Sequence, residues 1–147
     1  MRTAFSSVLV LLLFLLPGYS QFPPDLDPTV GPVEVFVTVS NDTAPQGGFN
    51  SADIAVVNNS NSITVRVILI TTLVYADGKR SILNLTSPQV LGPKGAIVLI
   101  PTFIVPSDAA LGTAQLKTTV VVAQMGGLGN MASPMAQDSD TFDVVAP

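Results

Sequence analysis

The sequence predicts an all-β domain in which about seven short antiparallel strands form a sandwich. Apolar residues alternate with polar ones at a period of two, turn residues separate these runs, and no run after residue 20 has the period of an amphipathic helix. Valine, isoleucine and threonine dominate the runs, and their branched β-carbons favour extended backbone over helix. A closed β-barrel is the main alternative architecture.

The first expected strand has the clearest pattern, because valines occupy every second position from Val33 to Val39. The third is the longest, and Asp77-Gly78 after it is a strong signal of a hairpin to the next strand. Pro101 lies within the fifth run, where it requires an edge position or a bulge because proline has no N–H for the ladder. The seven runs cover residues 33–40, 53–58, 63–75, 79–85, 96–105, 113–124 and 141–146.

The first 20 residues have the features of a secretory signal peptide. Arg2 provides the positive start, Val8 to Leu16 is an unbroken apolar run, Pro17-Gly18 breaks the helix, and Ser20 is a small residue at the expected cleavage site. The apolar run is nine residues long, whereas a membrane-spanning helix needs about 20. We therefore expect a secreted protein, extracellular or at the cell surface, with no stable membrane anchor after cleavage. A periplasmic location and an uncleaved anchor are the alternatives.

Two further regions follow the predicted signal peptide. Residues 21–32 contain four prolines and two aspartates and are expected to form an extended lead. Residues 33–147 form one expected domain, because no later stretch has the composition of a linker. The absence of cysteine means that packing, without disulfides, must stabilise this domain.

The charge of the chain argues against polyanionic partners. After residue 20 there are five basic residues and ten acidic ones, which gives a net charge of −5. Nucleic acids and anionic lipid surfaces require basic patches, so neither is expected as a partner.

The residue types needed for common catalytic sites are missing. The chain has no histidine and no cysteine, which excludes serine–histidine and cysteine–histidine nucleophiles and the usual zinc sites. We expect no enzyme activity and no cofactor. Asp138, Asp140 and Asp143 form a D-x-D-x-x-D pattern that resembles a source of calcium ligands. The other interpretation, that these acids keep an edge strand soluble, is favoured.

Two groups of residues outside the strands are candidates for modification or partner binding. Asn41, Asn58 and Asn84 begin N-x-S/T tripeptides and are candidate glycosylation sites, although turn residues that cap the local backbone are the favoured interpretation. The glycine-rich loop around residues 125–137 contains Met125, Met131 and Met135. Flexible methionine side chains suit adaptable partner contacts, and copper binding is a weaker hypothesis.

The third strand is apolar on both faces. Residues of one parity from Ile63 to Tyr75 form a plausible core face, while Ile68, Ile70 and Val74 have the opposite parity. Branched aliphatic side chains on an outer face imply that something covers them. The two hypotheses are a segment of the same chain and another protein subunit. Val98 and Ile100 have the same property in the fifth run.

The order of turns resembles that of the bacterial immunoglobulin-like and fibronectin-III-like modules of extracellular proteins. The resemblance rests on the Asn-rich loop after the second strand, the Asp77-Gly78 hairpin, the Pro93-Lys94-Gly95 turn, and the step from Val105-Pro106 to Leu111-Gly112. It covers residues 33–146, but the aromatic residue usual after the last glycine is absent. The resemblance implies an immunoglobulin-like β-sandwich that serves as an adhesive, spacer or docking unit.

Two functions are consistent with these patterns. The first is a structural subunit that packs through an apolar outer sheet face on copies of itself, in a fibre or layer. The second is a monomeric module that recognises a protein through the loops at 59–62 and 125–137. A glycan ligand is weakly supported, because the chain has no tryptophan to stack on a sugar.

Overall fold

The computed structural model describes residues 29–30, 32–125 and 135–147. β-Strands are the only regular secondary structure in these ranges, and turns and loops connect them. No helix in these ranges is long and apolar enough to cross a membrane. The strands are β1 (Thr29–Val30), β2 (Val33–Val39), β3 (Thr43–Pro45), β4 (Phe49–Asn58), β5 (Val65–Val74), β6 (Arg80–Leu85), β7 (Gln89–Leu91), β8 (Ala96–Leu99), β9 (Thr102–Ile104), β10 (Gly112–Met125) and β11 (Met135–Val145).

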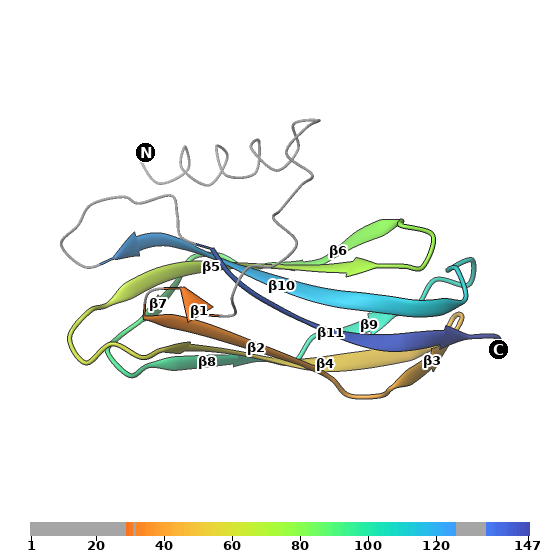
Figure 1. The fold of residues 1–147 in the computed structure, drawn as a ribbon, viewed down its shortest axis with the longest axis horizontal. Helices are drawn as coiled ribbons and strands as arrows, with labels where there is room; N and C mark the ends of the chain where they lie inside the picture. Colours follow the sequence, from red (N-terminus) through yellow and green to blue (C-terminus); the bar gives the residue numbers. More distant parts are fainter. Residues whose placement is uncertain (1–28, 31, 126–134) are drawn as a thin grey trace.

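The strands form two sheets that pack face to face as an immunoglobulin-like β-sandwich (Figure 1). Sheet A has the order β1-β2-β4-β8, and β9 also pairs with β4. Sheet B has the order β3-β11-β10-β5-β6, and β7 also pairs with β5. The sandwich rather than the barrel is therefore the architecture, and the expected all-β class is confirmed.

The core lies between the sheets and is made by alternate residues of each strand. In β2 the four valines at odd positions are buried while Phe36 and Thr38 face out, as the period of two predicts. Leu69, Leu73 and Leu116 are fully buried on the facing side of sheet B. The rings of Phe103 and Phe142 contact each other across the sandwich with their centroids 5.7 Å apart.

The described ranges contain more strands than the seven expected, and some of them are longer than expected. Pro101 divides the fifth run into β8 and β9, because it has no N–H with which to continue the ladder. Strand β4 begins at Phe49, earlier than expected, although Asn50 and Ser51 are poor strand formers; the buried Asn50 amide bonds to the Asn41 carbonyl oxygen. Strand β11 begins at Met135.

The expectation that all strands are antiparallel is wrong for one pair. Strand β3 pairs with the end of β11 in parallel, with Thr43 opposite Asp143. This short strand forms one edge of sheet B, where Pro45 is tolerated because an edge amide needs no partner strand. Gly47 lies in the turn between β3 and β4. Its φ is positive, at 73°, which glycine adopts without strain.

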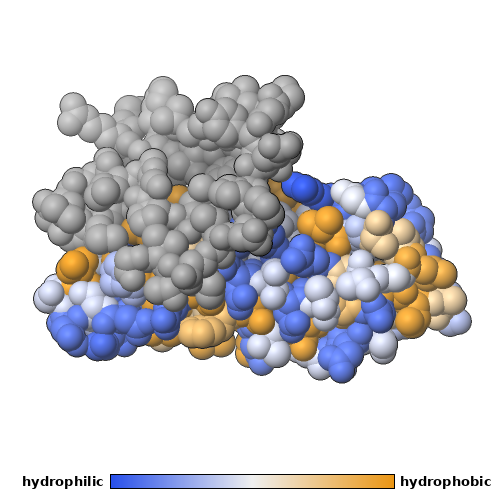
Figure 2. Space-filling view, in the orientation of Figure 1, coloured by the Kyte–Doolittle hydropathy of each residue, from blue (hydrophilic) through white to orange (hydrophobic). Residues whose placement is uncertain are grey.

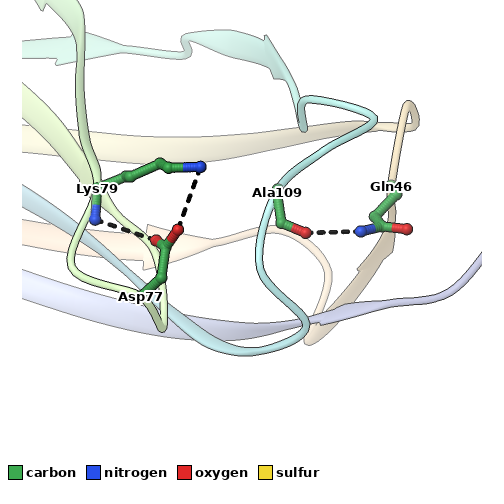
Figure 3. A network of polar contacts seen from close by, with 4 residues as sticks. All are labelled: Gln46, Asp77, Lys79 and Ala109. Atoms are coloured by element: carbon green, nitrogen blue, oxygen red, sulfur yellow. Dashed lines mark hydrogen bonds and ion pairs between the residues drawn. The ribbon is translucent and has the colours of Figure 1, made fainter.

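The expected Asp77-Gly78 hairpin is present between β5 and β6. Gly78 has a φ of 81°, which glycine adopts without strain. Asp77 accepts a hydrogen bond from the Lys79 backbone N–H at 3.0 Å, and its other oxygen is 3.3 Å from the Lys79 ammonium (Figure 3). These contacts lower the pKa of Asp77. At the same end, Gln46 donates to the Ala109 carbonyl oxygen at 2.6 Å and ties the β3–β4 turn to the loop before β10.

Candidate functional site

Asp138 and Asp140 connect the two sheets. Both carboxylates face inward from β11, where the Asp138 Oδ2 accepts the Val37 N–H at 2.7 Å and the Asp140 Oδ2 accepts the Val39 N–H at 2.8 Å. These amides lie on the side of β2 that faces away from β4, beyond the two residues that pair with β1. The two side chains therefore bond to backbone amides that would otherwise be left open at the edge of β2.

This arrangement replaces both earlier interpretations of the D-x-D pattern. The Asp140 Oδ1 also accepts the Thr141 N–H, so both oxygens of this carboxylate are engaged by backbone amides. Asp143 faces the other side of the sheet and accepts the Thr113 hydroxyl. Within the described ranges, no group of three acidic side chains is positioned to hold a metal ion. The pattern is a structural device that closes one side of the sandwich.

The three candidate glycosylation asparagines lie in different environments. Asn58 is fully buried, and its Nδ2 donates to the carbonyl oxygens of Ile63, Leu91 and Gly92 while its Oδ1 accepts the Ser60 N–H. In the folded domain this nitrogen joins the loop after β4 to the end of β7 and the turn that follows it, and it is not presented to solvent. Asn41 is exposed and bonds to Asn50, and Asn84 is half-buried in β6.

The strands that flank the two loops proposed for partner binding terminate at the same end of the sandwich. The first follows β4 and leads into β5, and the second connects β10 with β11. Met125, the last residue of β10, is opposite Val65, the first residue of β5. Met131 and most of its loop lie outside the described residues. The first loop is tightly held, because Lys94 donates to the Asn59 carbonyl oxygen at 2.6 Å in addition to the Asn58 contacts.

The register places Ile68, Ile70 and Val74 on the outer face of sheet B, as expected. Ile68 is only 7% exposed, and Ile70 and Val74 are half-buried. Their neighbours Thr119, Val121 and Gln137 on β10 and β11 are also buried, and the Gln137 Oε1 has no hydrogen-bond partner among the described residues. The most exposed apolar side chains of this face belong to Ile82 and Val90.

The outer face of sheet B is also basic. Arg66 has the same parity as Ile68, Lys117 is opposite Thr72, and Arg80 is opposite Val74, so all three cations emerge on this side. Burial lowers the pKa of Lys117, and the positive charge of Arg80 lowers it further. Three of the five basic residues that follow residue 20 therefore share one face.

The outer face of sheet A carries the most exposed apolar surface. Phe36 on β2, Ala55 on β4 and Val98 on β8 are direct register neighbours and form a row across the sheet. Phe36 is 49% exposed, Val98 is 60% exposed and Ile100, which follows β8, is 66% exposed. We call these four residues the sheet A patch. Figure 2 shows a small group of hydrophobic side chains at the lower edge, left of centre and between hydrophilic ones, on the side where Figure 1 places β2, β4 and β8.

Sequence reasoning identified half of this patch. Val98 and Ile100 were recognised by their parity, but Phe36 and Ala55 were not. The available signal was an aromatic residue at an outward position of β2, between Glu34 and Thr38. Joining these residues into one surface required the strand order, because β2 and β8 are both neighbours of β4 but are more than fifty residues apart in the chain.

No family model and no curated protein sequence matches the chain. Solved structures share its fold at low sequence identity. The CARDB domain of a Pyrococcus furiosus protein has a TM-score of 0.50 and 13% identity, with 88% of this chain and 98% of that domain covered. This neighbour is an immunoglobulin-like β-sandwich.

Two longer proteins contain a similar sandwich. The Pseudomonas fluorescens alkylpurine DNA glycosylase AlkC has a TM-score of 0.57 and 10% identity over 78% of this chain and 31% of that one. The Bacillus subtilis sporulation control protein Spo0M has a TM-score of 0.51 and 14% identity over 80% of this chain and 51% of that one. The chain thus spans about a third and about half of these two proteins. Identities this low indicate a shared fold only.

Proposed function

We propose that this chain is a secreted, non-catalytic structural subunit, related in kind to bacterial extracellular immunoglobulin-like modules, that packs on copies of itself in a fibre or layer. The sheet A patch is the observation that carries the proposal. A monomer in water gains nothing from placing Phe36, Val98 and Ile100 side by side on an outer face, and contiguous apolar surface of this kind is typical of protein–protein contacts.

The charges of the two outer faces support contact between unlike faces. Glu34 and Asp53 lie on the outer side of sheet A, and among the described residues no lysine or arginine lies on that side of its strands. Arg66, Arg80 and Lys117 lie on the outer side of sheet B. Sheet A of one copy and the solvent-exposed part of sheet B of the next, which includes Arg66 and Arg80, are therefore complementary in charge. A contact between two different surfaces leaves one of each unoccupied, so it propagates into an open assembly.

The oligomeric state tests this proposal. The protein is expressed from its full sequence, purified as exported, and measured by size-exclusion chromatography with light scattering over a wide concentration range. We expect association that Phe36→Lys weakens at least tenfold, because a charge then replaces the aromatic side chain of the patch. Phe36 lies on an inner strand and faces out, so the core and the ladder are unchanged.

The matched control is Ser107→Lys, at an exposed position in the loop between β9 and β10, outside both outer faces. It introduces the same charge outside the apolar row and should leave association near the wild-type value. A protein that stays monomeric at millimolar concentration contradicts the proposal. Equal effects of both substitutions contradict the assignment of the contact to the patch. Ile68→Lys with Ile70→Lys tests the outer face of sheet B in the same assay.

The alternative function is a monomeric binding module. It is favoured by the strands that flank the loops at 59–62 and 125–137, which terminate at one end of the sandwich. A monomer whose partner binding is abolished by changes in these loops, and is unaffected by Phe36→Lys, would establish this function in place of assembly.

A further inference from the structure

Strand β8 forms an edge of sheet A, and no other strand of the described ranges pairs with its outer side. It pairs with β4 on one side, and the strand order of sheet A ends with it. The hydrogen bonds Asn58 N–H to Gly95 O and Ala52 N–H to Pro101 O show that odd-numbered residues of this segment turn their backbone groups toward β4. In an antiparallel pair the intervening residues point the other way. The N–H and C=O groups of Ala96, Val98 and Ile100 therefore face away from the sheet.

Three other edges in the described ranges, those of β6, β3 and β2, have features that oppose pairing with another chain. Strand β6 begins with Arg80 and has a register shift opposite Thr71 and Thr72. Strand β3 contains Pro45, and the edge of β2 beyond β1 is closed by Asp138 and Asp140. Residues 96–100 have the sequence AIVLI, with no charge, proline or glycine. An uncharged, apolar edge of this kind is a template for strand addition.

We propose that β8 of one copy pairs antiparallel with β8 of a second copy, about a two-fold axis that passes beside Val98. This inference rests on the proposed assembly function. It specifies the contact through which two copies first associate. The pairing places Val98 opposite Val98 of the second copy and Ala96 opposite Ile100. Each of the three pairs exchanges two backbone hydrogen bonds, which gives roughly six across the interface.

The register itself argues for a second copy over an unrelated strand. Outward backbone groups occur at 96, 98 and 100, so the set is symmetric about Val98, as a two-fold contact requires. The small side chain of Ala96 lies beside the large side chain of Ile100, and no like charges meet. The row of Phe36, Ala55 and Val98 would continue into the same row of the second copy, so that the two patches become one surface on a continuous sheet.

A proline substitution at the edge tests the pairing. The Val98 N–H is not used in the ladder with β4, so Val98→Pro removes an outward donor and leaves the internal bonds in place. Analytical ultracentrifugation of the exported protein should give a dimer dissociation constant at least about a hundredfold larger than the wild-type value, because both central hydrogen bonds are lost. Val98→Thr is the reference, because it keeps the amide and the side-chain shape while it changes the same position of the sheet A patch. The dissociation constant of Val98→Pro should exceed that of Val98→Thr at least about tenfold.

Amide hydrogen exchange provides a second measurement that does not depend on the proline variant folding. In wild-type protein the Val98 amide should exchange at least tenfold more slowly at concentrations above the dissociation constant than below it, while the Arg66 amide in β5 should not change. Circular dichroism and thermal unfolding report whether Val98→Pro keeps the fold.

The outcomes separate this inference from the proposed function. If the wild-type protein is monomeric at all concentrations, the assembly function fails and the pairing fails with it. If the protein associates, Phe36→Lys weakens association and Val98→Pro does not, the assembly function stands and the β8 pairing is overturned. Equal effects of Val98→Pro and Val98→Thr also overturn it, because the side chain and not the amide would then be responsible. The β8 pairing is also overturned if the Val98 amide exchanges at the same rate at all protein concentrations.

Discussion

At the scale of single residues, Asp138 and Asp140 provide the hydrogen-bond acceptors that a neighbouring strand would otherwise provide for the edge of β2. Each carboxylate accepts one backbone N–H from the opposite sheet at less than 3 Å. Hydrogen bonds to a charged acceptor are stronger than neutral ones, and an amide left open in a half-buried setting is costly. The same two residues resemble metal ligands in the sequence, since both roles require carboxylates at a spacing of two.

Removing these carboxylates should destabilise the domain without any metal. We expect Asp138→Ala and Asp140→Ala each to lower the free energy of unfolding by about 1–3 kcal/mol, because the Val37 or Val39 amide loses its acceptor. Urea unfolding in the presence of a chelator measures this. Asp143→Ala, which changes the exposed third acid of the pattern, should cost less than about 0.5 kcal/mol. Losses that appear only when calcium is added would contradict the structural role.

The role of Asn58, like those of Asp138 and Asp140, follows from the backbone groups to which its side chain bonds. Its side chain bonds to carbonyl oxygens from two separate stretches of chain, Ile63 and Leu91–Gly92, and its own oxygen accepts the Ser60 N–H. We expect Asn58→Ala to cost roughly 3 kcal/mol, since several buried polar groups lose their partner together. Urea unfolding should show little change for the neighbouring exposed Asn59→Ala. A cost below about 1 kcal/mol for Asn58→Ala would mean that water replaces these bonds.

At the scale of elements, the β5–β6 hairpin is stabilised both by its local turn sequence and by the burial of a side chain in the core. The turn is fixed by Asp77-Gly78, but Tyr75 before it is buried in the core. Burial raises the pKa of the Tyr75 phenol, and the negative charge of Asp108 raises it further. The folded chain therefore binds the phenolic proton more tightly than the unfolded chain does.

This shift predicts a specific alkaline destabilisation. The stabilising effect is fully present below the ordinary pKa of 10.0 and is lost as the pH rises through the raised value of the folded state. The wild-type free energy of unfolding should therefore fall relative to that of Tyr75→Phe above about pH 10, by at most about 1.4 kcal/mol per pH unit. Lys117 has the opposite sign but is present in both proteins, so its effect cancels. Parallel stability profiles of the two proteins from pH 8 to 11 would contradict the prediction.

At the scale of the whole molecule, apolar and charged residues are distributed unequally between the two outer faces. Acidic side chains accompany the apolar row on sheet A, and basic side chains lie across sheet B. The unequal distribution matters more than the net charge, because a chain with a net charge of −5 after residue 20 would otherwise repel its own copies.

Association between the unlike faces should depend on salt. We expect the association to weaken about tenfold between roughly 50 mM and 500 mM salt, because screening removes the attraction between exposed charges. Light scattering across this range measures it. Arg66→Gln with Arg80→Gln should remove most of the salt dependence, whereas Lys79→Gln, in the hairpin with Asp77, should not. Association that strengthens steadily with salt would indicate a purely apolar contact.

The sequence by itself determined the fold class and most strand positions, because a period of two and turn residues such as Asp77-Gly78 are local signals. It also determined that one face of residues 63–75 lies in the core. Only the tertiary structure decided which strands are neighbours, that β3 runs parallel to β11, and that Pro101 separates two strands at an edge. The roles of Asp138, Asp140 and Asn58, and the sheet A patch, were likewise decided there. Each depends on contacts between residues far apart in the chain, and a local pattern has no information about which distant strand will lie beside it.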